Sequence, residues 1–422
     1  MEKKFCEINH EILSLEPKKI AIAVSGGADS ICLALLLKAL FKNHNTQIYT
    51  FTVDHRLRKT SALEALDNQQ YLNSLGFTNE ILTWQHKTEI NSNIQSLARQ
   101  ARYDLLITKC LELGIKYLFI GHHQDDLAEN FLIRLRRGSG LDGLAAIKKT
   151  ITVQNVAIIR PLLSFTKIEI QNYLLGMGLK WFEDPSNQNT SFERVKVRNI
   201  LKQEELLSKR IAGAANHLRI VKDYVEDKIK QKEREIIIYD SNLHVIKIEL
   251  VKFLALCEYE QFTIISNALQ FIGSKIYKPR LESLTKVIEA IKIGTLKNFS
   301  LHSCIITLFK QNYIVICKEA CKKTLMLDKK ETLWHSIYKV SLVELQIYQD
   351  LEIASLGQNG WQNFESKNLI PETIIENYPK IVFYALPVIK RLEKIVFIPH
   401  LNYYKEESYK NIRITNSLQA EA

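Results

Sequence analysis

The sequence predicts an α/β fold, with an N-terminal, mainly parallel sheet flanked by helices and smaller helical and α+β domains behind it. Its 422 residues, 46% of them hydrophobic, are too many for one typical core and enough for two or three domains. The first two hundred residues alternate short apolar runs with amphipathic stretches, as repeated βα units do. Beyond about residue 190 this alternation fades, which predicts separate modules.

The first βα units follow from the order of apolar and polar residues. Residues 19–24 are predicted as the first strand and 31–41 as its helix. Residues 47–53 are predicted as the second strand. The next helix begins at Ser61-Ala62-Leu63-Glu64, which has the Ser-x-x-Glu spacing of a capping box, and runs to about Leu75.

The alternation continues with a weak third strand at 79–83, a helix at 94–113, a fourth strand at 117–120 and a helix at 126–137. Polar clusters follow the strand ends. Since open α/β sheets bind ligands outside the carboxyl ends of their strands, we expect one ligand site formed by residues 25–30, 54–58 and 121–126.

The rear of the chain has a different pattern. Residues 192–234 are predicted as a long charged helix that connects to the other modules. Strand-like segments follow at 304–309, 313–317 and 395–399. The predicted domains are 1–215, 216–325 and 326–422.

Charge and cysteine content limit the partners and the location. The chain has 57 Lys plus Arg against 46 Asp plus Glu, a formal charge of +11, which favours a polyanionic partner: RNA, DNA or an anionic membrane. The start of the chain lacks the apolar core of a secretory signal, and no later run reaches membrane-spanning length. Seven scattered cysteines suit a reducing compartment and form no zinc or iron–sulfur pattern. We therefore expect a cytoplasmic protein without a membrane partner.

A glycine loop, Ser25-Gly26-Gly27-Ala28-Asp29-Ser30, follows the first predicted strand. Its glycines allow a sharp turn that brings N–H groups close to a ligand, and the next helix adds a partial positive charge at its N-terminus. The loop therefore predicts an anion cradle, with a turn that caps a helix as the alternative. The glycine loop matches neither G-x-x-x-x-G-K-S/T nor G-x-G-x-x-G, which argues against an ordinary P-loop NTPase or a dinucleotide-binding site here.

In its strand-loop-helix context, this loop resembles the mark of the PP-loop ATP pyrophosphatase family, Ser-Gly-Gly-x-Asp-Ser, and implies an adenine nucleotide alpha hydrolase-like sheet. The resemblance implies ATP binding, pyrophosphate release and an adenylated intermediate. It implies that the loop, Ala28 included, binds ATP, with Ser25, Gly26, Gly27 and Ser30 around the phosphates. Asp29 would help to hold Mg²⁺, which would stabilise the departing pyrophosphate together with the cradle.

Further motifs look like one branch of that family, the tRNA(Ile)-lysidine synthetases. They lie between about residues 18 and 200, in the order and spacing of the branch, at 53–58, 98–103, 121–130, 137–144, 160–163 and 184–187. The resemblance implies that ATP adenylates the C2 oxygen of the wobble cytidine in an isoleucine tRNA with a CAU anticodon. Free L-lysine then displaces AMP to form lysidine, which changes codon reading from AUG to AUA.

An acidic pair opens the helix after the fourth strand. Asp126 and Glu129 are three residues apart and so lie on nearly the same face. Such carboxylates could bind an ammonium of lysine and accept its proton, and a helix cap with a solvated acidic face is the alternative. His122 and His123 precede them. We expect these histidines to form hydrogen bonds or contact phosphate, because no third ligand for zinc is evident.

Candidate phosphate contacts accompany the other strand ends. Asp54, His55 and Arg58 could contact adenosine or phosphate, or form a solvated basic turn. Arg102, three residues after Arg99 on a predicted helix, is expected to contact ATP or the RNA backbone.

Three more arginines are candidates for tRNA contacts. Arg137 begins a glycine-containing segment that could form a mobile basic loop or an ordinary C-cap. Arg194 and Arg198 could track tRNA phosphates, although Arg194-Val195-Lys196-Val197-Arg198 departs from the branch pattern, which often has Asn after the first Arg. Short rear segments at 278–280, 301–304 and 386–388 resemble the tRNA-binding C-terminal domains of the branch. The sequence is compatible with a homodimer.

Alternatives come from the same family and from a different class. A PP-loop tRNA thiolation enzyme would need reactive cysteines, typically C-x-x-C, which the chain lacks. A non-catalytic RNA-binding protein would not be expected to keep polar clusters at several strand ends. A PP-loop amidotransferase would need an N-terminal nucleophile or a glutaminase-like domain, and the sequence shows neither.

Overall fold

The computed structural model describes residues 1–58, 60–86, 94–182, 193–203, 205–275, 277–335, 337–342, 350–366 and 376–416. The chain divides into two compact units, Met1–Tyr224 and Val225–Ala422. Each unit has sheets and apolar clusters of its own. The three predicted domains stay a prediction. Within the described ranges, no helix is long and apolar enough to cross a membrane.

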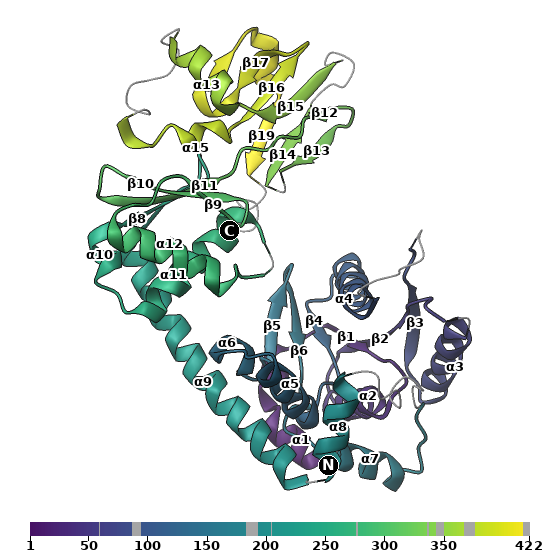
Figure 1. Ribbon diagram of the computed structural model, residues 1–422. Helices are drawn as coiled ribbons and strands as arrows, with labels where there is room; N and C mark the ends of the chain where they lie inside the picture. Colours follow the sequence, from purple (N-terminus) through teal and green to yellow (C-terminus); the bar gives the residue numbers. More distant parts are fainter. Residues whose placement is uncertain are drawn as a thin grey trace. The chain divides into compact units, whose positions relative to one another are not determined.

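The described strands of the first unit form one sheet with the order β3-β2-β1-β4-β6-β5 (Figure 1). Among them, β5 alone runs antiparallel to its neighbour, and the other pairs are parallel. The α/β prediction and its four strands are confirmed. The β5–β6 hairpin, whose two strands have only four residues each, was not among the predicted strands. The strands are β1 (Lys19–Ala23), β2 (Gln47–Asp54), β3 (Thr78–Thr83), β4 (Tyr117–Phe119), β5 (Thr150–Val153) and β6 (Val156–Ile159).

Helices accompany the sheet in the predicted order, with ends that differ from the prediction by a few residues. The predicted helix over 192–234 corresponds to α8 and α9, and residues 192 and 204 lie outside the described ranges. The helical segments are α1 (Glu2–Ile8), η1 (His10–Leu15), α2 (Ala28–Leu40), α3 (Ser61–Ser74), α4 (Ile94–Glu112), α5 (Gln124–Arg136), α6 (Leu141–Leu144), α7 (Lys167–Gly176), α8 (Glu193–Gln203) and α9 (Glu205–Ile236), of which α9 continues into the second unit.

Strand β1 lies at the centre of the sheet and is buried on both faces. Successive side chains of a strand point to opposite faces. Accordingly, one face packs in an apolar cluster with side chains of α2 through Ile20 and Ile22, followed by Val24 just after the strand. The other face packs in an apolar cluster with side chains of α4 through Ala21 and Ala23. A continuous apolar run is typical of such a strand in a parallel sheet. Both faces are therefore covered, and the carboxyl edge remains for ligands.

The predicted capping box at Ser61 and Glu64 is wrong. Helix α3 begins at Ser61, but its N-cap residue is Thr60, whose helical backbone angles keep its side chain from capping an amide. The Thr60 hydroxyl donates to Glu64 Oε1 at 2.8 Å instead. A true capping box opens α7, where Glu169 N donates to the Thr166 hydroxyl at 3.2 Å and Thr166 N donates to Glu169 Oε2 at 2.8 Å.

The described strands of the second unit form antiparallel sheets with the orders β7-β8-β11-β10-β9, β12-β15-β16-β17-β18 and β13-β14-β19. The strand predictions at 304–309, 313–317 and 395–399 are confirmed by β10, β11 and β17. The strands are β7 (Ile237–Asp240), β8 (Val245–Glu249), β9 (Phe299–Leu301), β10 (Cys304–Phe309), β11 (Tyr313–Lys318), β12 (Leu325–Met326), β13 (Glu331–Trp334), β14 (Tyr338–Ser341), β15 (Leu351–Ser355), β16 (Pro387–Arg391), β17 (Lys394–Ile398), β18 (Tyr403–Tyr404) and β19 (Arg413–Asn416).

Helices cover the first of these sheets. The long helix α11 packs on β8, β10 and β11, and an apolar cluster joins it to α12. This arrangement agrees with the α+β character predicted for the rear of the chain. The helical segments are α10 (Leu250–Leu254), α11 (Glu258–Gly273), α12 (Leu281–Ile293), α13 (Gly357–Ser366), α15 (Ile381–Tyr384), η4 (Pro399–Leu401) and η5 (Glu407–Asn411).

Candidate active site

The glycine loop, residues 25–30, lies between β1 and the start of α2, as predicted. Gly27 is the N-cap residue of α2 and supplies no side-chain hydrogen bond. The first amides of a helix lack partners within the helix, and the helix dipole favours an anion there. The start of α2 at Ala28 therefore has the chemistry of a phosphate cradle.

Gly26 gives the loop its sharp turn. Its φ of +82° lies in the left-handed region that favours glycine. A Cβ at this position would lie 3.0 Å from Phe182 Cδ2 and 3.1 Å from Asn68 Oδ1. Ser30 closes the loop, since its Oγ accepts a hydrogen bond from Ser25 N at 3.1 Å and donates to a loop carbonyl at 2.9 Å. The loop residues thus determine the shape of the cradle.

The end of β4 approaches the start of α2 at Gly121. A Cβ on Gly121 would lie 3.1 Å from the carbonyl carbon and oxygen of Asp29 and 3.2 Å from Ser30 N. Only glycine allows this approach without displacing backbone atoms. It brings the segment after β4, which carries His123, beside Asp29.

Three carboxylates surround the buried side chain of His123. Its Nδ1 lies 3.4 Å from Asp125 Oδ2, and its Nε2 lies 3.7 Å from both Asp29 Oδ1 and Asp126 Oδ2. Burial by itself lowers the pKa of His123, but the attraction of Asp126, Asp125 and Asp29 outweighs it and raises the pKa to about 9. His123 is therefore an imidazolium at neutral pH.

The same contacts act on the carboxyl groups. Burial raises the pKa of Asp125, but interactions with His123, with the Lys167 amide at 2.7 Å and with the Ser208 hydroxyl at 2.9 Å lower it to about 2. The pKa of Asp126 is likewise raised by burial and is held well below its ordinary value by His123 and a nearby guanidinium. Both groups are carboxylates at neutral pH.

His122 lies near cations as well as near Asp126. Burial lowers the pKa of His122 to about 3, and the charges of Arg160, Arg99 and Arg102 act in the same direction, whereas the charge of Asp126 opposes them. Burial and the charge of Arg102 also lower the pKa of His55. The structure thus brings together the predicted residues Arg102, His55 and His122. It also shows that the two adjacent histidines differ in charge at neutral pH.

Arg160 was predicted only as one residue of the motif at 160–163. Its side chain is 4% exposed at the end of β6, and one guanidinium nitrogen donates to the carbonyl of Lys148 at 2.8 Å. Interaction with Tyr103 opposes the lowering of the Arg160 pKa by burial. Its position directly after a strand was the available signal.

Lys167 was not among the predicted site residues. Its Nζ donates to both carboxylate oxygens of Asp29 at 2.7 Å, so Asp29 holds a cation at the start of α2. The available signal was the Thr166-x-x-Glu169 spacing, which marks a helix start directly after a strand and its loop. That signal places Lys167 at the carboxyl edge but does not identify its partner.

Glu129 is paired with the two arginines that were predicted to contact tRNA. Its carboxylate accepts a hydrogen bond from Arg194 Nε at 2.9 Å and another from Arg198 Nε. An Nη atom of Arg194 also lies 3.5 Å from Asp126 Oδ1. The predicted acidic pair and the predicted basic pair therefore meet in one ion-pair cluster.

The remaining predicted residues have local partners. Asp54 is buried, and its Oδ1 accepts a hydrogen bond from Arg56 N at 2.9 Å in the turn after β2. Arg58 pairs with Glu64 at 3.0 Å, an exposed ion pair of a kind that contributes little to stability. Arg137 is the C-cap residue of α5 and pairs with a carboxylate of α8 at 2.5 Å. The motif at 184–187 lies outside the described residues.

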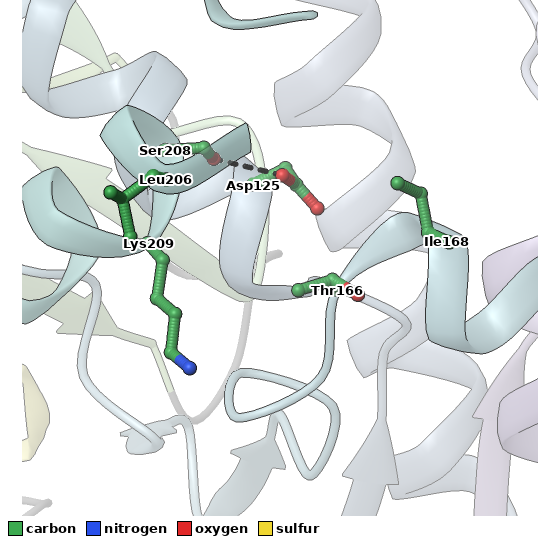
Figure 2. Close-up of a pocket in the computed structure, with 6 residues that line it drawn as sticks. All are labelled: Asp125, Thr166, Ile168, Leu206, Ser208 and Lys209. Carbon is green, nitrogen blue, oxygen red and sulfur yellow. Dashed lines mark hydrogen bonds between the residues drawn. The ribbon is translucent and has the colours of Figure 1, made fainter. Parts of the chain in front are cut away.

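A cavity of about 420 Å³ lies beside Asp125. Figure 2 shows the side chains around it, which come from the starts of three helices. Helix α5 supplies a carboxylate, the start of α7 supplies a hydroxyl and an aliphatic side chain, and α9 supplies a hydroxyl, an aliphatic side chain and an ammonium. The Ser208 hydroxyl orients the Asp125 carboxylate by a hydrogen bond of 2.9 Å. The cavity is lined by Asp125, Thr166, Ile168, Leu206, Ser208 and Lys209.

Comparison with known proteins identifies the family. Residues 1–205 match the PP-loop domain. The chain is 34% identical over 425 residues to the tRNA(Ile)-lysidine synthase of Orientia tsutsugamushi (strain Boryong), covering 97% of this chain and 95% of that protein. It is 33% identical over 418 residues to the tRNA(Ile)-lysidine synthase of Rickettsia bellii (strain OSU 85-389), with coverages of 96% and 95%. The chain belongs to the tRNA(Ile)-lysidine synthase family.

Membership in the tRNA(Ile)-lysidine synthase family confirms the predictions of a PP-loop enzyme that uses ATP and of a tRNA-modifying ligase. Among solved structures, the U34-tRNA thiolase NcsA from Methanococcus maripaludis is a distant likeness, 21% identical with a TM-score of 0.42, covering 48% of this chain and 71% of that chain. The roles of individual site residues stay predictions.

Two of the three cysteines of the PP-loop unit, Cys32 and Cys110, argue against the thiolation alternative for this member of the tRNA(Ile)-lysidine synthase family. Cys32 and Cys110 are fully buried, and burial raises the pKa of each thiol to about 12. At neutral pH they are protonated and inert as nucleophiles. These two cysteines do not supply the reactive sulfur that thiolation needs.

The raised pKa of His123 predicts a pH-dependent stability. Because the folded-state pKa, about 9, exceeds the ordinary 6.5, protonated His123 stabilises the fold fully below pH 6.5, and the stabilisation is lost as pH rises through 9. We expect the free energy of unfolding of the first unit to fall by roughly 3 kcal/mol over that window. Urea denaturation at several pH values would measure this decrease.

Two variants assign this decrease to His123. His123→Gln removes the histidine, and His217→Gln, at an exposed histidine of α9, is the control. His123→Gln should remove the decrease between pH 6.5 and 9, and His217→Gln should keep it. An equal decrease in all three proteins would show that His123 is not its source.

Proposed function

We propose that this chain is the ATP-dependent ligase that joins L-lysine to C2 of the wobble cytidine of an isoleucine tRNA with a CAU anticodon. ATP adenylates the C2 oxygen, lysine displaces AMP, and the lysidine so formed reads AUA instead of AUG. The observation that carries the proposal is the juxtaposition of the glycine-loop carboxylate Asp29 with the acidic start of α5 around His123. We place this activity in the cytoplasm.

The adenylation step uses the carboxyl edge of the sheet. The cytidine C2 oxygen attacks the α-phosphorus of ATP, and the bond to the pyrophosphate oxygen breaks. Backbone N–H groups at the start of α2 and the ammonium of Lys167 are positioned to stabilise the charge that collects on pyrophosphate. The guanidinium groups of Arg102 and Arg160 suit a further phosphate, of ATP or of the RNA.

Asp29 is the residue that would hold Mg²⁺. A magnesium ion in such a site usually takes one or two carboxylates and keeps phosphate and water ligands, so no larger cluster is needed. The described residues contain no group of three His, Cys, Asp or Glu side chains arranged around a metal. The carboxylate of Asp29 holds the ammonium of Lys167, which supports a cation-binding role for Asp29 at the cradle. Bound Mg²⁺ would neutralise charge on the phosphates.

The displacement step needs an uncharged amine of lysine. Once a carboxylate has accepted a proton from the ammonium, the amine attacks C2 and the C2–O bond to AMP breaks. Asp126 and Glu129 are the candidates for this proton transfer, as carboxylates on the same face of α5. Asp125, the residue before them, presents its carboxylate to the cavity shown in Figure 2.

The cavity beside Asp125 suits free lysine. The carboxylate of Asp125 can pair with one ammonium of the bound lysine, and the ammonium of Lys209 can pair with its α-carboxylate. The side chains of Ile168 and Leu206 can contact the methylene groups of the bound lysine. Since lysine has two ammonium groups, one can remain at Asp125 while the other reaches the acidic pair.

The rest of the proposal concerns the RNA. A formal charge of +11 supports binding of a polyanion over much of the surface. We propose that the second unit binds the body of the tRNA. A homodimer remains a prediction, which light scattering of the purified protein would test.

The experiment that tests the function supplies the protein with ATP, Mg²⁺, labelled lysine and the isoleucine tRNA with a CAU anticodon. We expect label in the RNA and one AMP released for each lysine incorporated. A tRNA with uridine at the wobble position is the matched control and should stay unlabelled. Failure to label the CAU tRNA, when a known lysidine synthase labels it, would defeat the proposal.

A further inference from the structure

The ion pairs of Glu129 are unequally buried. The Glu129 side chain is 3% exposed, whereas Arg194 and Arg198 are 45% and 31% exposed. The carboxylate therefore lies inside, and the guanidinium groups extend from it toward solvent. A polyanion that approaches from solvent can reach the arginines before anything reaches the carboxylate.

The buried carboxylate needs a cation at all times. Removing one partner of a buried ion pair leaves an uncompensated charge, which is strongly destabilising. An ammonium of lysine can bind Glu129 only where the arginines withdraw, and the arginines can withdraw only where another cation replaces them. Access to Glu129 is thus an exchange of one ion pair for another.

Helix α8 can remain in place during this exchange. Its residues Val197 and Leu201 are buried in a cluster with Ala128 of α5, which anchors the helix. Arg194 and Arg198 project from the same helix on long, flexible side chains. Rotation of these side chains can move the guanidinium groups by several bond lengths while the backbone stays packed.

We propose that Arg194 and Arg198 are exchangeable counter-ions that couple RNA binding to lysine binding. RNA phosphate takes the guanidinium groups, and an ammonium of lysine takes the freed carboxylates of Glu129 and Asp126. Each charge keeps a partner, so the two ligands favour each other. The proposal rests on the proposed function for the identity of both ligands.

The coupling is reciprocal. If RNA increases the affinity for lysine by some factor, lysine must increase the affinity for RNA by the same factor. Without RNA, the arginines occupy Glu129 and compete with lysine. With RNA bound, the site carries uncompensated negative charge that lysine neutralises.

The test measures binding without chemistry. In the absence of ATP, equilibrium dialysis gives the affinity of the full-length protein for labelled lysine, with and without a saturating transcript of the CAU isoleucine tRNA. We expect the transcript to increase the affinity for lysine by about tenfold, within the usual range of coupling between sites. Filter binding of the RNA with and without lysine should give the same factor.

Variants assign the coupling to the arginines. Arg194→Gln removes one competing cation, so we expect tighter lysine binding without RNA and a coupling factor reduced to about threefold or less. Arg194→Lys keeps the charge and should retain most of the coupling. Arg210→Gln, at an exposed position of α9, removes the same charge elsewhere in the first unit and should behave as the unaltered protein.

Two results would overturn the proposal. One is an unchanged coupling factor in Arg194→Gln, and the other is weaker lysine binding without RNA in both Arg194 variants, which would mean that Arg194 supports the lysine site itself. If Arg194→Gln fails to fold, Arg198→Gln, which removes the other arginine paired with Glu129, takes its place, and an unchanged coupling factor in that variant overturns the proposal. A protein that labels the CAU tRNA but shows no coupling refutes only this inference, and a protein that labels no tRNA refutes the proposed function.

Discussion

Replacing Asp29 with alanine is expected to slow adenylate formation by about 10²–10³-fold or more, comparable with the loss of a main charge-stabilising group in other active sites. Asp29 holds the ammonium of Lys167 at 2.7 Å and is the residue proposed to hold Mg²⁺. Its loss removes the carboxylate that would hold Mg²⁺ and that positions the ammonium of Lys167 where pyrophosphate leaves. Pyrophosphate release in a single turnover, with enzyme in excess over tRNA, measures this step directly.

The same Asp29→Ala protein should bind tRNA with nearly unchanged affinity, because that affinity comes from a dispersed basic surface. Asp67→Ala is the matched control, since Asp67 is an exposed carboxylate on α3, and it should leave both measurements unchanged. Loss of tRNA binding by a correctly folded Asp29→Ala protein would contradict this separation of catalysis from binding. So would adenylation at the native rate.

Replacing Glu129 with glutamine is expected to separate the two chemical steps. A neutral amide cannot accept the proton of the lysine ammonium, so lysine transfer should fall by about 10²–10⁴-fold, the usual contribution of general base catalysis. Adenylation should persist, because the glycine loop and Asp29 are unchanged. Labelled lysine in the RNA and released pyrophosphate, measured in the same reaction, would show the separation.

The control for Glu129→Gln is Glu193→Gln. Glu193 also pairs with an arginine, Arg137, but in a largely exposed ion pair at the start of α8, so its replacement should leave both steps unchanged. Circular dichroism must first show that Glu129→Gln folds, since it removes a buried charge from two guanidinium groups. A folded Glu129→Gln protein that loses both steps equally would place Glu129 outside the lysine step.

Much of the first unit could be predicted from local patterns. Strand β1 is recognisable because it is buried on both faces from Ile20 onward and is therefore apolar there, and the change to polar residues after it marks the carboxyl edge. The glycine loop is recognisable because its backbone geometry requires specific residues, as the φ of +82° at Gly26 shows. The capping box at Ser61 was wrong because a spacing of two residue types does not specify backbone angles.

The ion-pair cluster could not be predicted in the same way. Glu129 and Arg194 are separated by 65 residues, and their contact depends on the register in which α5 packs against α8. That register is set by Ala128, Val197 and Leu201 in a small apolar cluster. Because the sequence shows both helices but not their relative rotation, it indicated an acidic pair and a basic pair without joining them.

By itself, the sequence determined the α/β alternation and the residue types available at the carboxyl edge, because these depend on local periodicity, and its motifs carried the resemblance to the PP-loop family. The tertiary structure alone decided that Lys167 pairs with Asp29, that His122 is neutral while His123 is protonated, and that arginines occupy Glu129. Charge states and ion pairs depend on burial and on distances through space, since Coulomb energy varies inversely with distance and with the local dielectric constant. Neither quantity follows from separation along the chain.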